Sequence, residues 1–432
     1  MSSKEKIANW GNYPVLEADV IETSDLILLE KCIKSASSII ARGNGRSYGD
    51  ASLNEFVYST KKLNQIYSFD KEKGIFECGS GVTLAVVLER IVPEGFFLEV
   101  TPGTKFITVG GAVAADVHGK NHHQKGCFSQ CLILLTLMTE TGEVKTCSST
   151  ENKELFFQTI GGMGLTGIIL KAQFRLQPIS TSYISYVNYI AEDLGALMEL
   201  FQKHKSTPYS VAWIDCLATG DKKGRGVFMS GKHIERDELP VKYRNNPLLY
   251  APKFKFKVGF NFPSFILSSF TIKLFNRYFY AKNKVKKETG IVTLEKFFYP
   301  LDSIKNWNKI YGKNGFIQYQ CVFPLSTSVS GLEEILDTVS SHSTPPFLAV
   351  LKLFGESNKE APWSFPMEGY TLAMDFKMHE GIEELVHNLD RIVKKYNGRI
   401  YLAKDAMSSN EVIEVPNPRT EKFSSVQSKR LS

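Results

Sequence analysis

Short apolar runs alternate with amphipathic runs over the first 180 residues, and clusters of glycine separate them. Residues 37–43 and 74–81 are typical of short β-strands. The apolar positions of residues 82–95 recur through about three turns and predict a helix that ends near Pro93 and Gly95. Two strands over residues 132–148, a capped helix after residue 149, a glycine-rich turn and a strand over 168–176 are predicted next. This order is typical of an α+β fold.

The hydrophobic pattern changes after Pro178, where the segments become longer and more aromatic. Residues 369–378 predict a strand, residues 380–398 an amphipathic helix that ends at Gly398, and residues 398–407 one more strand. We therefore place a domain boundary near residue 180.

The composition agrees with a soluble enzyme of two domains. The chain has 432 residues, 43% hydrophobic and 22% charged, which excludes disordered, collagen-like and disulfide-rich classes. Its seven cysteines include no CxxC pair, so neither a disulfide framework nor a zinc ribbon is indicated, and a reducing compartment is favoured. We expect no signal peptide and no membrane-spanning helix, because no run approaches ~18 apolar residues.

The positive charge is concentrated in one segment. Residues 239–287 hold eleven Lys or Arg and no Asp or Glu, so the rest of the chain, with 41 basic and 45 acidic residues, has a net charge of −4. Twelve aromatic residues are interleaved with these cations, from Tyr243 to Tyr280. Such a segment can face anionic lipid headgroups and insert its rings. The alternatives are a mobile basic surface loop and, less favoured, a nucleic-acid site, for which no known module is visible.

Two glycine-rich motifs are candidates for holding a phosphate. In ARGNGRSYGD (41–50), three glycines after a strand can direct backbone N–H groups at an anion, or they can form an ordinary tight turn. Their spacing differs from the GxGxxG nucleotide fingerprint. GMGLTG (162–167) has that spacing, but it follows a helix and precedes a strand, which is the wrong order for a Rossmann NAD site.

A third motif, residues 101–123, combines small residues with histidines. Gly110 and Gly111 leave room for a flat group against the backbone, or they reflect close packing. His118, His122 and His123 lack the distant second pair of ligands that zinc sites show, so we expect no metal. A hydrogen-bonding histidine beside a cofactor or substrate is the more natural interpretation.

These motifs together resemble a known family. ARGNGRSYGD, PGTKFITVGGAVAADVHGKNHH and IGGMGLTGIIL are similar to the FAD-binding half of the vanillyl-alcohol oxidase superfamily, and within it to the decaprenylphosphoryl-β-D-ribose 2′-oxidases. The likeness continues through residues 297–324, 351–376 and 399–405. It implies a PCMH-type FAD-binding domain over 1–180, an antiparallel-sheet substrate domain over 181–396, and a C-terminal return to the first domain over 397–432.

The resemblance also implies which residues contact the cofactor. A histidine of the first loop is bonded to the flavin in many relatives, whereas this chain has Arg46 there, so noncovalent FAD is expected, with Arg46 suited to a pyrophosphate or ribityl contact. The implied FAD contacts are Gly43, Asn44, Gly45, Arg46, Ser47, Tyr48, Gly49, Gly103, Thr104, Thr108, Gly110, Gly111, Asp116, His118, Gly119, Asn121, Gly162, Gly164, Gly167 and Ile168.

The implied reaction is transfer of the C2′ hydrogen of a ribofuranose to flavin while a base takes the hydroxyl proton. Lys404 matches the family's lysine beside the flavin, although it could be a surface lysine, and His118 and Tyr48 are competing proton acceptors. Gln318 and Gln320 alternate along one strand, so they share a face that can hold sugar hydroxyls. The remaining candidates are Lys120 and Lys352 for the phosphate end, and Trp213 and Tyr299 for the pocket walls.

The family's biology supplies further expectations. The expected substrate is a polyprenyl-phosphate pentose. An NADH-dependent short-chain reductase is expected as the partner that completes the epimerisation to the arabinose donor of cell-wall polymers. The protein is expected at the membrane periphery, in the cytoplasm or the cell envelope. A soluble-sugar or aldonolactone oxidase and a non-catalytic membrane-associated binding module are the alternatives. This chain has YLAKDA at the position where lactone oxidases have an HWAK-like sequence. This difference favours an oxidase of a polyprenyl-phosphate pentose over a lactone oxidase.

Two positions depart from the family pattern. Its WNICVDF-like segment reads YTLAMDF here, so we expect Met374 in place of the cysteine beside the flavin and Thr371 in place of the asparagine. A thioether cannot form the covalent adducts that the family's nitro-aromatic inhibitors make with that thiol.

Overall fold

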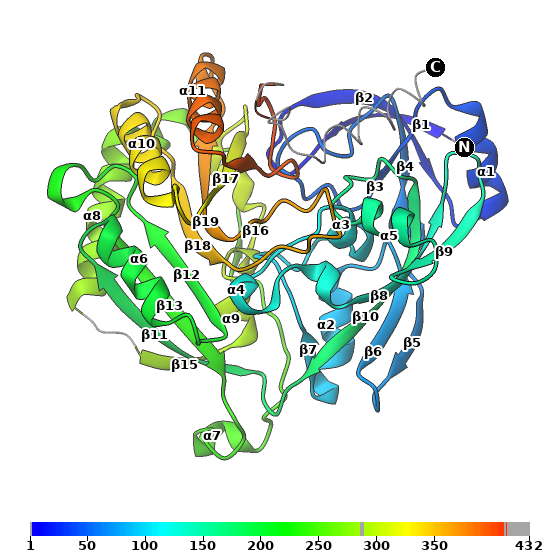
Figure 1. Cartoon of the computed structure of the whole chain (residues 1–432), viewed down its shortest axis with the longest axis horizontal. Coiled ribbons are helices and arrows are strands. Elements are labelled where there is room, and N and C mark those ends of the chain that lie inside the picture. Colours follow the sequence, from blue (N-terminus) through cyan, green and yellow to red (C-terminus); the bar gives the residue numbers. More distant parts are fainter. Residues whose placement is uncertain (1, 286–288, 410–411, 413–432) are drawn as a thin grey trace.

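The computed structural model describes residues 2–285, 289–409 and 412 of the chain. Three sheets organise it, and Figure 1 shows the largest in the left half of the molecule and the other two in the right half. Lys286 and Lys287 of the basic segment, and nearly all of the chain after Ser409, lie outside the described residues.

The chain begins in a four-stranded sheet of order β1-β2-β4-β3. Its first pair is antiparallel, and the pairings of β4 with β2 and β3 are parallel. Leu29 and Ile33 of helix α1 pack with Tyr58 against it. The elements are β1 (Ser2–Ala8), β2 (Val15–Glu22), α1 (Leu26–Ser35), β3 (Ile40–Arg42) and β4 (Phe56–Ser59).

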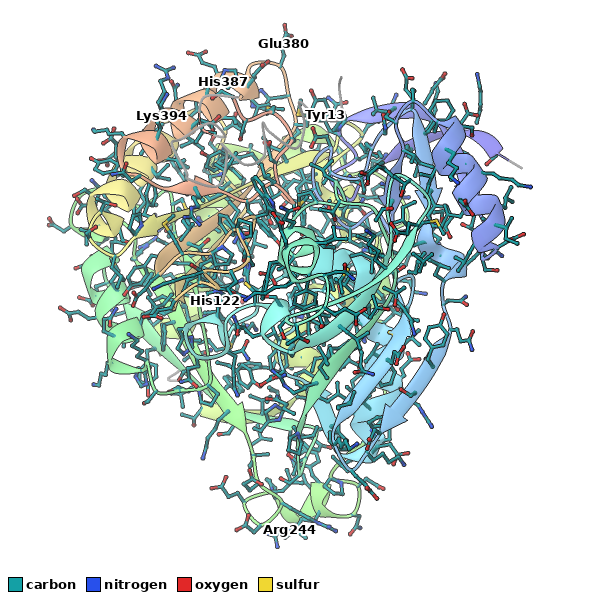
Figure 2. All side chains as sticks on the ribbon, turned by 45° about the vertical axis from the view of Figure 1, so that its right-hand side comes forward. Tyr13, His122, Arg244, Glu380, His387 and Lys394 are labelled. Carbon is teal, nitrogen blue, oxygen red and sulfur yellow. The ribbon has the colours of Figure 1, made fainter. Side chains whose placement is uncertain are left out.

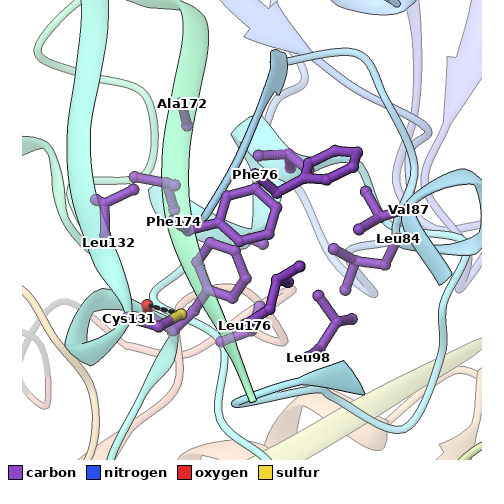
Figure 3. Packing of buried hydrophobic residues seen from close by; sticks show 14 of the residues in the cluster. Phe76, Leu84, Val87, Leu98, Cys131, Leu132, Ala172, Phe174 and Leu176 are labelled. Carbon is purple, nitrogen blue, oxygen red and sulfur yellow. Dashed lines mark hydrogen bonds between the residues drawn. The ribbon is translucent and has the colours of Figure 1, made fainter. Parts of the chain in front are cut away.

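The second sheet has the order β5-β6-β10-β8-β9, with β7 paired to the end of β10. Phe76, Phe174 and Leu176 form its core together with Leu84 and Val87 of helix α2 (Figure 3). The elements are β5 (Ile66–Asp70), β6 (Ile75–Gly79), α2 (Leu84–Ile91), β7 (Phe96–Leu98), α3 (Val109–Ala114), α4 (His122–Lys125), β8 (Leu132–Met138), β9 (Val144–Ser148), α5 (Lys153–Thr159) and β10 (Ile168–Pro178).

From Tyr183 onward the described strands, apart from one short pair, belong to an antiparallel sheet of order β15-β11-β13-β12-β18-β19-β17-β20. One face is covered by helices α6, α10 and α11, whose apolar side chains form a core with it. The elements are β11 (Tyr183–Ala191), α6 (Leu194–Lys203), β12 (Tyr209–Ile214), β13 (Gly226–His233), β15 (Thr289–Thr293), β17 (Phe316–Pro324), α10 (Ser328–Ser341), β18 (Leu348–Phe354), β19 (Gly369–Lys377), α11 (Ile382–Lys395) and β20 (Arg399–Ile400).

The basic segment forms irregular structure and one long helix. Strand β14 (Phe256–Lys257) pairs in parallel with β16 (Ile304–Lys305), and the helices are α7 (Val241–Arg244), α8 (Ser269–Val285) and α9 (Leu294–Phe298). Figure 2 shows Arg244 at one end of the molecule, far from Glu380 and His387. Short 3₁₀ turns are η1 (Thr60–Lys62), η2 (Val92–Glu94), η3 (Phe128–Gln130), η4 (Gly220–Lys222), η5 (Ser264–Leu267), η6 (Leu301–Ser303) and η7 (Trp307–Tyr311).

The α+β pattern predicted from the sequence is confirmed, including the strands near residues 40, 75, 132 and 369 and the helices α2, α5 and α11. Helix α5 lacks the expected Ser/Thr cap, because its N-cap residue is Asn152, which makes no side-chain capping hydrogen bond. One predicted strand is wrong. The strand expected over residues 398–407 ends at Ile400, because the amides of Lys404 and Asp405 donate to the carbonyl of Tyr401 and close a turn. This turn brings Lys404 to the candidate site.

Candidate active site

The face of the eight-stranded sheet opposite the three helices carries polar side chains. Alternation along β17, β18 and β19 places Tyr319, Leu351 and Leu372 in the core beneath the helices. Their neighbours therefore face the other way, and the pairing sets Gln318 opposite Asp375 and Lys352 opposite Thr371. The expected shared face of Gln318 and Gln320 is thus part of a larger polar surface.

Asp375 is the buried centre of this surface. The Tyr311 hydroxyl donates to its Oδ2 at 3.1 Å, and the Gln318 amide donates to its Oδ1. Burial raises the pKa of Asp375 to about 6, although the hydrogen bond from Gln318, the Lys404 charge and the hydrogen bond from Tyr311 oppose that rise. The carboxyl group is consequently an anion at neutral pH.

Gln320 connects the sheet to the histidine motif. Its Nε2 lies 3.1 Å from His118 Nε2 and 3.2 Å from Thr371 Oγ1, and the Thr371 hydroxyl donates to the Cys321 carbonyl at 2.7 Å. Burial, with smaller contributions from Lys352, His122 and Lys404, holds the pKa of His118 well below its usual range. His118 is therefore neutral, with its Nε2 already engaged by Gln320.

Lys404 enters the site from the turn after β20. Its Nζ lies 3.7 Å from the centre of the Tyr48 ring, and the Tyr48 amide donates to the Ala403 carbonyl at 3.3 Å. Burial lowers the pKa of Lys404 to about 7; the anion of Asp375 opposes this shift and the cation of Lys352 adds to it. Lys404 can therefore lose its proton far more readily than an ordinary lysine.

Lys120 and Lys352 add two more desolvated cations. Burial lowers the pKa of Lys352 to about 8, and burial together with the charge of Lys352 lowers that of Lys120 to about 7. The Lys120 ammonium donates to the Phe297 carbonyl and lies 4.4 Å from that residue's ring centre. Two desolvated lysines, one of them also lowered by the charge of the other, favour an anion nearby.

The loop of residues 43–49 packs beside Lys404. The Arg46 guanidinium lies between two rings, 4.0 Å from the centre of Trp10 and 5.1 Å from that of Phe106. Asn44 donates to the Phe106 carbonyl at 2.9 Å, and the Ser47 carbonyl accepts from the Trp10 amide. A Cβ on Gly49 would stand 1.5 Å from the Asp405 carbonyl oxygen, so glycine is required where this loop meets the Lys404 turn.

The other candidate glycines fall into two groups. A Cβ at Gly103 would meet nothing within 4 Å, and one at Gly111 or Gly164 would meet a single atom at 3.2 or 3.3 Å. Of these three, Gly103 borders open space, whereas at Gly111 and Gly164 the neighbouring atom would have to move by a few tenths of an ångström. At the other glycines a Cβ would clash with another part of the chain, with the nearest atom 2.2–2.8 Å away. These are Gly43, Gly45, Gly110, Gly119, Gly162 and Gly167.

Several predicted cofactor contacts have partners within the chain. The buried Asp116 carboxylate accepts from the Ser129 amide at 2.9 Å and from the Ser364 hydroxyl at 2.5 Å. Thr108 caps α3 by accepting from the Gly111 amide, and the Thr104 hydroxyl accepts from the Phe106 amide. The Asn121 Nδ2 donates to the Glu99 carbonyl, and Ile168 packs in the core against α1. Asp116 thus joins the α3 turn to the loop after β18.

The two expected wall residues lie apart from each other. Tyr299 is 1% exposed, packs in the core of the second sheet and bonds to the Thr101 hydroxyl at 2.6 Å, so it has an interior role instead of a place on a pocket wall. Trp213 is on the polar face of β12, where its ring lies 4.8 Å from that of Phe279 on α8. His122 is likewise interior, 2% exposed, and its Nδ1 accepts from the Gly355 amide.

The expectation that Met374 replaces the family's cysteine is wrong. Met374 is fully buried in the core under the helices, whereas Ala373, paired with Gln320, is on the polar face. Counted position by position, the fourth residue of YTLAMDF is Ala373, which also corresponds to the cysteine of WNICVDF. The site therefore has a methyl group where a thiol was considered, and the argument against covalent adducts applies to Ala373.

Comparison with known proteins agrees with this architecture. Residues 22–148 match the FAD binding domain family. The chain is 33% identical to the decaprenylphosphoryl-β-D-ribose oxidase of Mycolicibacterium smegmatis over 98% of its own length and 93% of that protein. The chain belongs to the decaprenylphosphoryl-β-D-ribose oxidase family. It is accordingly an FAD-dependent oxidoreductase.

Two further relatives place this family member in a wider group. It is 29% identical to a Streptomyces coelicolor protein named for its position in the mprA 5′ region, over 79% of this chain and 94% of that protein. It is 27% identical to L-gulonolactone oxidase of Scyliorhinus torazame, but over only 36% of each chain.

The residues of this family member fit FAD. Gly103 borders open space and Gly111, at the start of α3, is exposed, so a flat isoalloxazine or an extended pyrophosphate can approach the backbone there. Within the described part of the chain, Ser80 Oγ, His118 Nδ1 and Asn121 Oδ1 are buried polar atoms without a hydrogen-bond partner. Such groups are costly unless a ligand or water satisfies them. Among the described residues no cluster of three His, Cys, Asp or Glu could hold a metal ion.

Sequence reasoning missed Asp375 and Tyr311. The signal for Asp375 was available, because it alternates with Thr371 and Ala373 along one strand in the same way that Gln318 alternates with Gln320. Tyr311 had no such signal, since it comes from a 3₁₀ turn and reaches Asp375 only through the tertiary fold.

Proposed function

We propose that this chain oxidises the C2′ hydroxyl of a polyprenyl-phosphate-linked ribofuranose to a 2′-keto sugar, the first half of an epimerisation. Noncovalent FAD supplies the acceptor for the C2′ hydride when bound. The observation that supports the proposal most is the meeting of Lys404, Tyr48, Gln318 and Asp375 on the polar sheet face, in a chain 33% identical over 98% of its length to a decaprenylphosphoryl-β-D-ribose oxidase.

Lys404 is the base in this proposal. Its pKa of about 7 leaves a substantial neutral fraction that can take the hydroxyl proton as the hydride leaves. His118 is a weaker candidate because its Nε2 is engaged by Gln320 and burial strongly lowers its pKa. Burial raises the pKa of Tyr48 well above its usual range, so its hydroxyl stays protonated. Tyr48 then acts as a positioning residue for Lys404.

The substrate's polar groups have partners on the same face. Gln318 and Gln320 bind sugar hydroxyls, and Lys352 and Lys120 bind the phosphate, whose charge would raise their lowered pKa values. Arg46, Gly103 and Gly111 bind FAD. We retain the division into a FAD-binding domain (1–180), a substrate domain (181–396) and a C-terminal return (397–432), and a separate NADH-dependent reductase as the partner that completes the epimerisation.

We also propose peripheral attachment to a membrane, and helix α8 supports it. Its outward stripe holds Phe270, Leu274 and Tyr278, which are 76%, 59% and 64% exposed, with Lys273 and Arg277 beside them. Its inward side is fixed by polar contacts: Asn276 donates to Asp215 at 2.8 Å and the Tyr280 hydroxyl to the Ala191 carbonyl. Spacing of four residues puts the exposed rings on one side, as an interfacial helix needs. No helix among the described residues is long and apolar enough to cross a bilayer.

Anaerobic bleaching of the bound flavin tests the proposal directly. Prenyl-phosphoryl ribose should bleach it, whereas free ribose and aldonolactones should bleach it far more slowly. Faster bleaching by a lactone would instead indicate a soluble-sugar oxidase, in line with the partial likeness to L-gulonolactone oxidase. Absence of bleaching by every sugar tested would favour a binding protein.

A further inference from the structure

The Thr371 hydroxyl is buried and lies between two hydrogen-bonding neighbours. Thr371 is 1% exposed, and its Oγ1 is 2.7 Å from the Cys321 carbonyl oxygen and 3.2 Å from Gln320 Nε2. A hydroxyl has one hydrogen and a carbonyl oxygen can only accept, so this hydrogen is donated to Cys321. Toward Gln320 the hydroxyl oxygen is therefore an acceptor. Only the NH2 end of the Gln320 amide can donate to it, and the direction of that amide is fixed.

The same amide nitrogen also contacts the histidine motif. Gln320 Nε2 lies 3.1 Å from His118 Nε2 and can donate its second hydrogen there. Because His118 Nε2 must then accept, the one proton of the neutral imidazole is on Nδ1. Burial holds the pKa of His118 well below its usual range, which keeps the ring neutral. Nδ1 has no hydrogen-bond partner in the described part of the chain, so the tautomer of His118 is set by Gln320.

Gln320 is left with a single group for a ligand. Both hydrogens of its amide are committed, one to Thr371 and one to His118. The group that it can still offer is the carbonyl oxygen Oε1, which only accepts. A ligand atom that hydrogen-bonds to Gln320 must therefore be a donor. Hydroxyl groups meet this requirement, whereas ether, carbonyl and phosphate oxygens do not.

Strand pairing places Gln320 between the two ends of the candidate site. On β19, the residues of the polar face on either side of its level are Asp375 and Thr371. The charge of Asp375 acts on Lys404, and Thr371 is paired with Lys352 of β18. A sugar that extends from the proposed base Lys404 to a phosphate at Lys352 therefore passes over Gln320.

We propose that Thr371 is a positioning residue, which turns the Gln320 amide so that its carbonyl oxygen accepts a hydrogen bond from a sugar hydroxyl other than the oxidised one. The inference rests on the proposed function and adds the polarity that the sugar must present. The reacting hydroxyl gives its proton to Lys404, so the donor to Gln320 is the hydroxyl at C3′ or C5′. A sugar with an acceptor at that position is rejected, because two acceptors face each other and the buried oxygen loses its partner.

Nitrogen-15 NMR of histidine in the FAD-loaded protein tests the hydrogen-bond chain without any sugar. Protonated and unprotonated ring nitrogens have well-separated chemical shifts, and the spectrum of His118→Gln assigns the signals. The wild type should carry the His118 proton on Nδ1. Thr371→Val keeps the side-chain shape but lacks the hydroxyl, so the Gln320 amide can turn and a population with the proton on Nε2 should appear. Thr371→Ser retains the hydroxyl and should match the wild type. A wild-type proton on Nε2, or the wild-type tautomer alone in Thr371→Val, would overturn the inference.

Fluorinated sugars test the polarity itself, because fluorine is close to a hydroxyl in size but cannot donate. In the wild type and in Thr371→Ser, kcat/KM for the 3′- or the 5′-deoxyfluoro analogue of prenyl-phosphoryl ribose should be at least about fivefold below that of the parent sugar. Thr371→Val should reduce this penalty, since its Gln320 amide can turn its N–H toward the fluorine. Any electronic effect of fluorine on hydride transfer is common to the three proteins and cancels in the comparison.

The two measurements separate this inference from the proposed function. Equal penalties in the wild type and Thr371→Val, no penalty at either position, or a Thr371→Ser variant that behaves like Thr371→Val would each overturn the role of Thr371, while turnover of the parent sugar upholds the oxidase. Inactivity on every sugar, with the His118 proton displaced in Thr371→Val, would reject the oxidase and leave the orienting role of Thr371 standing.

Discussion

The ammonium nitrogen of Lys404 lies 3.7 Å from the centre of the Tyr48 ring, and the two residues come from segments near opposite ends of the chain. A cation on the face of an aromatic ring is stabilised by roughly 0.5–2 kcal/mol. In the proposed reaction, proton transfer from the substrate hydroxyl converts neutral Lys404 into that cation. Tyr48 therefore stabilises the product form of the base.

Replacing Lys404 by methionine should remove this proton acceptor and keep the length of the side chain. We expect the rate of anaerobic flavin bleaching to fall by roughly 10²–10⁴-fold. FAD content should be unchanged. Lys395→Met, which removes an exposed lysine paired with Glu334, is the control and should keep the wild-type rate. Undiminished bleaching in Lys404→Met would remove Lys404 from the mechanism.

The pH dependence should respond in opposite directions to two neighbours of Lys404. The base must be neutral, so kcat/KM should rise with pH through a midpoint near 7. Lys352→Met removes a cation that lowers the pKa of Lys404, and the midpoint should move to higher pH. Asp375→Asn removes an anion that raises this pKa, and the midpoint should move to lower pH. Shifts of the same sign in both variants would contradict Lys404 as the titrating group.

Much of this site could be predicted from the sequence because it depends on strand alternation and local motifs. Gln318, Gln320 and the glycine loops were found in that way. The Lys404 turn, the Tyr311–Asp375 hydrogen bond and the interior position of Tyr299 could not be, since each depends on contacts between segments far apart in the chain. The assignment of Met374 failed through a one-residue displacement, which moves a side chain to the opposite face of a strand.

Thiol labelling can test which residue of β19 faces the site. In a Cys32→Ser background, which removes the one half-buried native cysteine, Ala373→Cys should react with a small maleimide in FAD-free protein. Met374→Cys should not react until the protein is unfolded, because its side chain is in the core. Mass spectrometry of the labelled peptide gives the site. Faster labelling at position 374 than at 373 would reverse the assigned faces.

FAD should be held without a covalent bond, with Arg46 as a main anchor. Acid precipitation should leave a colourless pellet and a yellow supernatant. Arg46→Gln should weaken FAD binding by roughly tenfold or more, as expected for a lost charge-assisted hydrogen bond. Arg90→Gln, an exposed arginine on α2, should bind FAD as wild type does. Flavin that stays with the pellet would contradict noncovalent attachment, and full FAD affinity in Arg46→Gln would remove Arg46 as an anchor.

Helix α8 should carry the attachment to anionic membranes. Replacing Phe270, Leu274 and Tyr278 together by serine removes the exposed apolar stripe but keeps Asn276 and Tyr280, which hold the helix to the sheet. We expect binding to vesicles containing phosphatidylserine to fall at least about tenfold, since each buried side chain contributes ~1.5–3 kcal/mol. A matched triple replacement of Val15, Ile27 and Val329, which are 52%, 66% and 51% exposed elsewhere on the surface, should bind as wild type does.

Added salt should weaken the binding that remains in the α8 variant, because cations such as Lys273 and Arg277 attract the headgroups through an interaction that salt screens. Equal losses in the two triple variants would mean that general surface hydrophobicity, and not α8, drives attachment.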